Sequence, residues 1–234
     1  MHIVTIHQPN FFPWLGYFDK ISKADSFVFF DDIQFPKKGG SWSNRIKLFI
    51  SGDVRWVTAA INRDYSGTRN INEMEFLSNN PWRLKMLKSL DTSYRRYPHF
   101  PETMAIIEPL ILNAESNIAE YNIHAVTQLG KKLGLGYDKI HRSSNLKKEG
   151  SSNELLCSIT KTLGGDTYMC GGGAQGYQDD NLFTKRGIKL IYQNFQHFKY
   201  PQFGQEHFVP GLSVIDALMN LGFQEVKKFI IKMK

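Results

Sequence analysis

A histidine follows directly after the first apolar run of the chain, where it could do acid–base chemistry. Residues 2–6 are rich in apolar side chains and lead into His7-Gln8-Pro9-Asn10, a polar stretch of the kind that closes a strand. An imidazole at such a position can accept a proton from an amine or a hydroxyl near neutral pH, so His7 is a candidate general base. The alternative is a structural histidine that hydrogen-bonds a buried main-chain carbonyl.

Two adjacent carboxylates end the second apolar run. Residues 26–30 have high strand propensity and are followed by Asp31 and Asp32. These carboxylates could bind a metal, orient His7 or hold an amino group, although neighbours at a strand end usually comprise one site residue and one solvated residue. We expect Asp32 to be the catalytic partner of His7, and Asp31 to contact the substrate.

A glycine-rich turn follows another short strand-like run near residue 170. The run of Gly171, Gly172 and Gly173 can bring main-chain N–H groups close to an anion, but it has neither the P-loop ending nor the Rossmann glycine spacing. Cys170 could be a nucleophile, although a cysteine at the end of a buried strand is commonly inert packing. The histidines at 197 and 207 lack zinc-ligand spacing, so we expect no metal site.

The chain carries a net charge of +7, and much of it lies in one segment. Residues 37–69 contain seven Lys and Arg against two Asp, which gives +5, and the segment begins with Lys37 and Lys38. Such a segment suits a phosphorylated small ligand as well as it suits nucleic acid. No helix-turn-helix, zinc-finger or RNP pattern is visible, so we expect no nucleic-acid partner.

The elements that must position these residues outline a parallel α/β sheet. The order strand, turn, helix (17–24) and strand within thirty residues is typical of a βαβ unit, which places ligands at the carboxyl ends of its strands. A strand over 54–61 and helices over 81–96 and 102–136 follow, so helices dominate the middle of the chain. A second α/β stretch has a helix at 153–163, strands at 167–170 and 188–193, and a helix at 213–221. The expected fold is therefore a mostly parallel, Rossmann-like sheet with a helical middle segment.

Composition indicates a folded protein of the cytoplasm. Of the 234 residues, 41% are hydrophobic and 13% aromatic, which excludes disorder, and no apolar run approaches the ~20 residues of a membrane span. No signal peptide is evident, and two cysteines fit a reducing compartment. Without repeats or linkers, we expect one domain over 1–234, with a helical subdomain at about 80–136 as an option. The oligomeric state stays open.

Several motifs closely resemble one family from end to end. The opening His7-Gln8-Pro9-Asn10-Phe11-Phe12-Pro13-Trp14-Leu15-Gly16-Tyr17, followed by Phe29-Phe30-Asp31-Asp32-Ile33-Gln34-Phe35-Pro36-Lys37, is similar to the start of WbqC-like proteins. The segments 42–47, 154–156, 168–177 and 212–216 also resemble that family. Cys170 stands where a Ser is usual, and Met86 stands where a His is expected.

The resemblance implies a role in bacterial surface-polysaccharide (O-antigen) biosynthesis. It implies a transferase that attaches a glycyl, other small acyl or imidoyl group to the amino group of a nucleotide-linked amino-deoxy sugar, and leaves the donor and any cofactor open. His7 and Asp32 would be catalytic. The expected substrate-binding residues are Gln8, Asn10, Trp14, Tyr17, Asp31, Lys37, Lys38, Trp42, Asn44, Arg45, Gly171, Gly172, Gly173 and Tyr177.

Two alternatives remain on the sequence alone. A non-catalytic glycan or nucleotide-sugar binding protein would use Trp14, Trp42 and Tyr17 to stack on a sugar or base. A nucleotidylyltransferase-like enzyme is the other, because strand, Pro-Trp-Leu-Gly-Tyr, helix and strand are loosely similar to the start of that class. In that comparison Trp14 and Tyr17 occupy the places of the two turn histidines.

Overall fold

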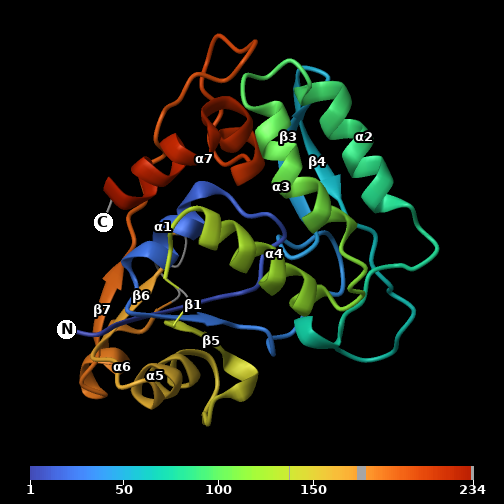
Figure 1. The fold of residues 1–234 in the computed structure, drawn as a ribbon. Helices are drawn as coiled ribbons and strands as arrows, with labels where there is room; N and C mark the ends of the chain where they lie inside the picture. Colours follow the sequence, from blue (N-terminus) through green and yellow to red (C-terminus); the bar gives the residue numbers. More distant parts are fainter. Residues whose placement is uncertain (137, 173–177, 233–234) are drawn as a thin grey trace.

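A five-stranded parallel sheet forms the centre of the computed structural model, which describes residues 1–136, 138–172 and 178–232. Its strands are β1 (Ile3–His7), β2 (Ser26–Phe29), β5 (Ile140–Arg142), β6 (Thr167–Cys170) and β7 (Lys189–Tyr192). They lie in the order β5-β2-β1-β6-β7, and every neighbouring pair is parallel (Figure 1). The expected α/β class with an N-terminal βαβ unit is confirmed.

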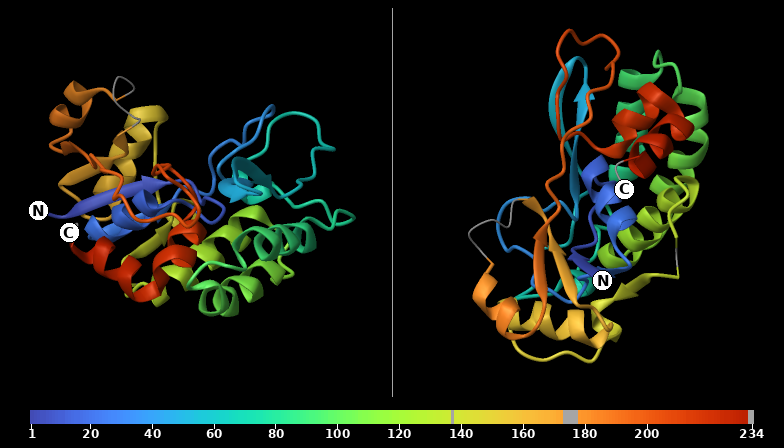
Figure 2. Two further views of the ribbon diagram at one scale, coloured as in Figure 1. Left: turned by 90° about the horizontal axis from the view of Figure 1, so that it is seen from above. Right: turned by 90° about the vertical axis from the view of Figure 1, so that its left-hand side faces the viewer.

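The strand order reverses at β1, the first strand of the chain. From β1 the chain moves outward through β2 to β5, then returns to the other side of β1 as β6 and continues outward to β7. The helices around the sheet are α1 (Leu15–Lys23), α5 (Ser152–Thr162), α6 (Asp180–Lys185) and α7 (Val214–Lys232). α1 and α7 cover one face, while α5 and α6 cover the other (Figure 2). In such doubly wound sheets, ligands bind outside the carboxyl ends of the two strands at the reversal.

An antiparallel hairpin and three helices form the middle of the chain. The hairpin strands are β3 (Arg45–Ile50) and β4 (Asp53–Thr58), and the helices are α2 (Trp82–Tyr94), α3 (Phe100–Leu112) and α4 (Ile118–Lys132). The helical pattern expected over 102–136 forms two helices, because the chain turns after Leu112 and the next helix starts after Asn117. The Asn117 side chain accepts a hydrogen bond from the main-chain N–H of Glu120, which caps α4. The hairpin lies beside α2, apart from the parallel sheet (Figure 1).

The apolar core spans the sheet and the middle helices. One contiguous cluster of buried side chains runs from Phe27 and Phe29 of β2 to Ile111 of α3 and Leu218 of α7. A smaller cluster on the other face of the sheet packs β1 and β6 against α5 and α6, and Phe183 is buried in it. Burial of these side chains is the main stabilising contribution to the fold.

A buried carboxylate joins the last part of the chain to the hairpin. Asp216 of α7 is completely buried and accepts hydrogen bonds from the hydroxyls of Tyr94 (3.1 Å) and Tyr200 (2.7 Å) and from Nε2 of Gln202 (3.3 Å). Tyr94 also accepts a bond from the main-chain N–H of Phe49 on β3. Burial raises the pKa of Asp216 to about 6. The group is therefore a structural link between α2, α7, the hairpin and the segment that precedes α7.

Candidate functional site

A cavity of about 980 Å³ opens at the carboxyl ends of β1 and β6, where the strand order reverses. Its polar lining includes His7, Gln8, Lys20, Gln193 and His197, and its aromatic lining includes Trp14, Phe30, Trp42, Tyr168 and Phe195. A concave site with a few convergent polar groups among aromatic walls is the usual form of a small-molecule site. We therefore take this cavity as the candidate functional site.

The loop that joins β1 to α1 is held rigidly and positions one wall of the cavity. Phe12 adopts a left-handed backbone conformation with φ of 36°, which is costly for a large side chain and is sustained by its complete burial. The hydroxyl of Ser213 donates to the Phe12 carbonyl (2.6 Å), and the main-chain N–H of Val214 donates to the carbonyl of Pro13 (2.8 Å). Trp14 is thereby presented to the cavity on a fixed backbone.

Gly16 leaves the space that two aromatic walls of the cavity occupy. A Cβ at this position would lie 2.9 Å from the Phe195 ring and closer still to Nε1 of Trp14. Any larger residue would therefore displace one of these side chains. The glycine in the Trp-Leu-Gly-Tyr stretch thus has a packing role next to the site.

His7 ends β1 and packs between aromatic rings at the cavity. Its ring centroid lies 4.6 Å from that of Tyr17 and 5.9 Å from that of Trp14. Burial, and secondarily the positive charge of Lys20, holds the pKa of His7 well below its ordinary value. Its Nδ1 is buried and has no hydrogen-bond partner within the described part of the chain. The imidazole is therefore neutral at pH 7 and retains an unused nitrogen.

The four expected binding residues near His7 take different positions. Gln8 and Trp14 line the cavity, as expected of residues that contact a substrate. Tyr17 is fully buried and donates its hydroxyl hydrogen to the Gln8 carbonyl (2.8 Å), so it supports the wall from behind. Asn10 is also buried, with Oδ1 unpartnered within the described residues, and does not line the cavity.

Lys20 is a buried lysine at the cavity, which the sequence reading missed. Only 3% of its surface is exposed, and its Nζ donates to the main-chain carbonyl of Ile6 (3.1 Å). Burial lowers the pKa of its amine to about 8. Gln193, which follows β7, was missed as well, and its Nε2 donates to the Gly16 carbonyl (2.6 Å) and to Asp19 (2.8 Å). The second α/β stretch therefore contributes to the same site as the first.

The Cys170 end of β6 also faces the cavity. The thiol is 2% exposed and donates to the carbonyl of Ile191 (3.5 Å), and burial raises its pKa. A thiol of this kind is poorly ionised at pH 7 and thus a weak nucleophile. Gly171 and Gly172 line the cavity, and a Cβ at either would meet no atom of the described residues within 4 Å. The expected binding residues Gly173 and Tyr177 lie outside the described residues.

Asp31 and Asp32 share the carboxyl edge with His7 but contact the residues that follow β5. Asp31 accepts hydrogen bonds from both hydroxyls of the 3-10 turn η2 (Ser143–Asn145), at 3.0 Å from Ser143 and 2.6 Å from Ser144. Asp32 forms an ion pair with Lys148 (2.5 Å) and accepts a bond from Ser143. Neither lines the cavity, and no described contact joins Asp32 to His7. Both carboxylates therefore join the loop after β2 to the residues that follow β5.

The basic segment reaches the cavity through one tryptophan. Trp42 lines it, with its ring centroid 5.5 Å from Trp14 and 5.0 Å from Trp56, and the guanidinium of Arg45 lies 4.1 Å from the Trp56 centroid. Asn44 is buried and donates to the Ala59 carbonyl (3.1 Å), which gives it a role within the hairpin. The exposed side chains of Lys37 and Lys38 do not line the cavity.

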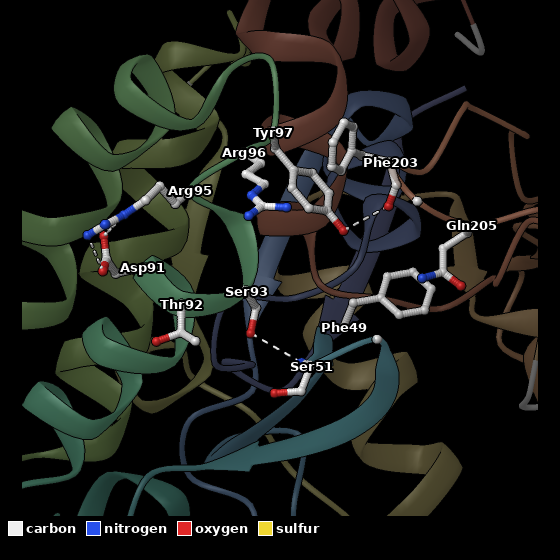
Figure 3. Close-up of a pocket in the computed structure, with 12 residues that line it drawn as sticks. Phe49, Ser51, Asp91, Thr92, Ser93, Arg95, Arg96, Tyr97, Phe203 and Gln205 are labelled. Atoms are coloured by element: carbon white, nitrogen blue, oxygen red, sulfur yellow. Dashed lines mark hydrogen bonds and ion pairs between the residues drawn. The ribbon is translucent and has the colours of Figure 1, made fainter.

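A second cavity of about 550 Å³ lies between the end of α2, the hairpin turn and the 203–205 loop (Figure 3). Its polar groups largely satisfy one another. Arg95 pairs with Asp91 (2.7 Å), and the Tyr97 hydroxyl donates to the Phe203 carbonyl (3.2 Å). It is smaller, and no residue of the parallel sheet lines it, so the first cavity is the better candidate.

The described residues form neither a cluster of metal-ligand side chains nor a membrane-spanning helix. No group of three or more His, Cys, Asp or Glu in this part of the chain is arranged to hold a metal ion. No described helix is long and apolar enough to cross a bilayer.

Comparisons with known proteins agree with the motifs in the chain. The chain is 25% identical over 223 residues to a protein of Mycobacterium tuberculosis (strain ATCC 25618 / H37Rv) named "Uncharacterized protein Rv1507c", and the match covers 95% of each chain. No solved structure matches it significantly. The model of the WbqC-like protein family matches residues 8–228, from the loop after β1 into the last helix. The chain therefore belongs to the WbqC-like protein family.

Proposed function

We propose that this protein is a transferase of bacterial surface-polysaccharide biosynthesis that modifies the amino group of a nucleotide-linked amino-deoxy sugar. The group transferred would be a glycyl, other small acyl or imidoyl group. The observation that carries the proposal is His7: a neutral imidazole that lines the cavity at the end of β1, where the strand order reverses. The form of the cavity supports a small-molecule ligand, and membership of the family supports the surface-polysaccharide role that the motifs imply.

The chemistry asks for a base next to the attacking amine. The amine nitrogen attacks the carbonyl or imidoyl carbon of an activated donor, a C–N bond forms, and the donor's leaving group departs with its bonding electron pair. The amine must lose a proton in this process, and His7 would accept it. A low pKa keeps His7 unprotonated before attack and lets the imidazolium release the proton readily to the leaving group or to water.

The aromatic walls would bind the sugar or the base. Trp14 and Trp42 lie side by side at the cavity with ring centroids 5.5 Å apart and planes inclined by 54°. Flat aromatic faces bind sugar rings and nucleobases through their apolar surface and π-systems. The same two walls favour the second candidate, a nucleotide-sugar binding protein without catalytic activity.

Turnover distinguishes the two candidates. UDP- and dTDP-linked 4-amino-4,6-dideoxy sugars are incubated with the protein and a panel of activated glycyl, acyl and imidoyl donors. The mass of the nucleotide sugar is then measured by mass spectrometry. We expect a mass gain on the sugar. His7→Asn should lower the rate ~10²–10⁴-fold with nucleotide-sugar affinity nearly unchanged, as for loss of a general base. The matched control is His124→Asn, on the exposed side of α4.

Each result of this experiment distinguishes between the transferase and the binding protein or tests the role of His7. Tight binding of the sugar with no mass gain for any donor supports the binding protein instead. A His7→Asn variant that turns over as fast as the wild type removes the general-base role. Asp32→Asn should cost less activity than His7→Asn, because the Asp32 carboxylate is bonded to Lys148 and Ser143.

A further inference from the structure

Lys20 carries a buried positive charge into the candidate site. It lies on α1, is 3% exposed and lines the 980 Å³ cavity next to the carboxyl ends of β1 and β6. Lysines are almost never fully buried unless a partner compensates for the lost hydration of the ammonium. The burial of this residue therefore demands a compensating group.

The groups around Lys20 do not supply a negative charge. Its bond goes to the neutral carbonyl of Ile6 (3.1 Å). Oδ2 of the neighbouring Asp19 carboxylate accepts from Lys23 (3.0 Å) and Gln193 (2.8 Å), and its Oδ1 is buried without a partner among the described residues but forms no ion pair with Lys20. Of the other titratable groups at this end of the sheet, His7 is neutral or cationic, and the Cys170 thiol is held neutral by burial. Within the described residues, the charge of Lys20 has no anionic partner.

We propose that Lys20 is the anion-binding residue of this cavity and that its ligand is a phosphate group of a nucleoside diphosphate. The ammonium has three N–H donors, and one is used on Ile6, so two are available to a ligand. Gly171 and Gly172 line the same cavity, and no atom of the described residues stands where their side chains would be, which lets a bulky anion approach the main chain. The proposal rests on the proposed function for the identity of the anion, and it deepens that function by naming the residue that holds the diphosphate.

The burial of Lys20 strengthens such a contact. An ion pair is much stronger in the interior than in water, because the effective dielectric constant is lower. Burial lowers the pKa of the amine to about 8, the Cys170 thiol opposes that shift only in part, and a bound phosphate would raise the pKa again. The site is thus built to hold the ammonium charged when an anion is present.

Binding of simple anions tests the proposal directly. Affinities for inorganic pyrophosphate, UDP and uridine are measured by calorimetry on the full-length wild type, Lys20→Met and Lys23→Met. Lys23 is the matched control, because it lies one turn further along α1, pairs with Asp19 and does not line the cavity. We expect Lys20→Met to weaken pyrophosphate and UDP at least tenfold, with Lys23→Met within twofold of the wild type. Uridine affinity should be equal in all three proteins.

Three results would overturn it. In the first, the wild-type protein binds neither pyrophosphate nor UDP. In the second, Lys20→Met binds both with wild-type affinity. In the third, Lys23→Met lowers the affinity for both as much as Lys20→Met does. A second measurement uses the folded wild-type protein, so that a variant that fails to fold cannot decide the result. NMR titration of ε-¹³C-labelled lysines, with the Lys20 signal assigned by its loss in Lys20→Arg, should show the Lys20 pKa rising by one unit or more with pyrophosphate. An unmoved pKa also overturns the proposal.

The outcome is independent of turnover. If pyrophosphate binding depends on Lys20 but no amino sugar is modified, the transferase fails and the anion site stands. If sugars are modified but anion binding is indifferent to Lys20, the anion site fails and the transferase stands.

Discussion

Replacing the buried carboxyl of Asp216 by an amide should change how the stability of the protein depends on pH. The pKa of Asp216 is about 6 in the folded protein and close to 3.9 in an unfolded chain. The folded state therefore binds the proton more tightly, so the contribution of this group to stability is fully present below pH 4. It is lost as the pH rises to 6 and above.

The size of the effect follows from the pKa difference. About two pKa units correspond to about 3 kcal/mol between fully protonated and fully ionised protein, and about 2 to 3 kcal/mol falls between pH 4 and 7.5. In Asp216→Asn this pH dependence is absent. The amide can no longer accept all three bonds from Tyr94, Tyr200 and Gln202, which adds a constant loss of about 1 to 3 kcal/mol at every pH.

Urea unfolding of both proteins at pH 4 to 8, followed by tryptophan fluorescence, separates the two terms. The difference in unfolding free energy should shift by about 2 to 3 kcal/mol in favour of the variant as the pH rises, because every other titrating group is common to both proteins. A difference that stays constant within about 0.5 kcal/mol across this range would show that Asp216 titrates like an exposed carboxyl. The reasoning from burial would then be refuted.

Three further predictions concern the cavity. Cys170→Ser should leave turnover largely intact, since the thiol is buried and neutral, and a substrate trapped covalently on Cys170 would contradict this. Gly16→Ala should weaken nucleotide-sugar binding and change the fluorescence of Trp14, because the new methyl group displaces the indole; unchanged affinity and spectrum would count against that packing. Lys20→Met should raise the free energy of unfolding by up to about 3 kcal/mol at pH 7, as the pKa difference between 8 and 10.5 implies. Thermal unfolding at several pH values measures this gain in stability, which should disappear above about pH 10.5, where the lysine is neutral in the folded and the unfolded state. A gain that is independent of pH would contradict its attribution to the buried charge.

The sequence predicts the fold class well because the strand signals are strong where burial is complete. The runs at 26–30 and 167–170 correspond to β2 and β6, whose residues are buried throughout. The sequence reading missed β3, although the alternation of Arg45, Ile46, Lys47 and Leu48 is a period-2 signal that could have found it. β5 has only three residues, too few for any periodicity, so its place depends on pairing with β2.

The site was harder to predict than the fold because it depends on strand order. His7 ends β1 and Asp32 follows β2 at the same edge, but β2 lies between β1 and β5, so the Asp32 side chain meets residues that follow β5. Parallel pairing alone does not say which neighbour a strand-end residue faces. Lys20 carried no local signal, since its burial arises only when α1 packs on the end of β1. Gln193 reaches the site only because β7 joins the same sheet.

The central place of β1 has a consequence for how the chain is made. The hydroxyl of Thr5 on β1 donates to the carbonyl of Met169 on β6, across a sequence separation of 164 residues. At a synthesis rate of roughly 5–20 residues per second, the first strand leaves the ribosome roughly 10 to 30 s before its second neighbour exists. During that interval one edge of β1 is unpaired and one apolar face is uncovered, which makes the nascent chain prone to wrong strand pairing. Fragments that end before residue 167 should therefore aggregate or be held by chaperones, while the complete chain closes the gap as soon as β6 is released.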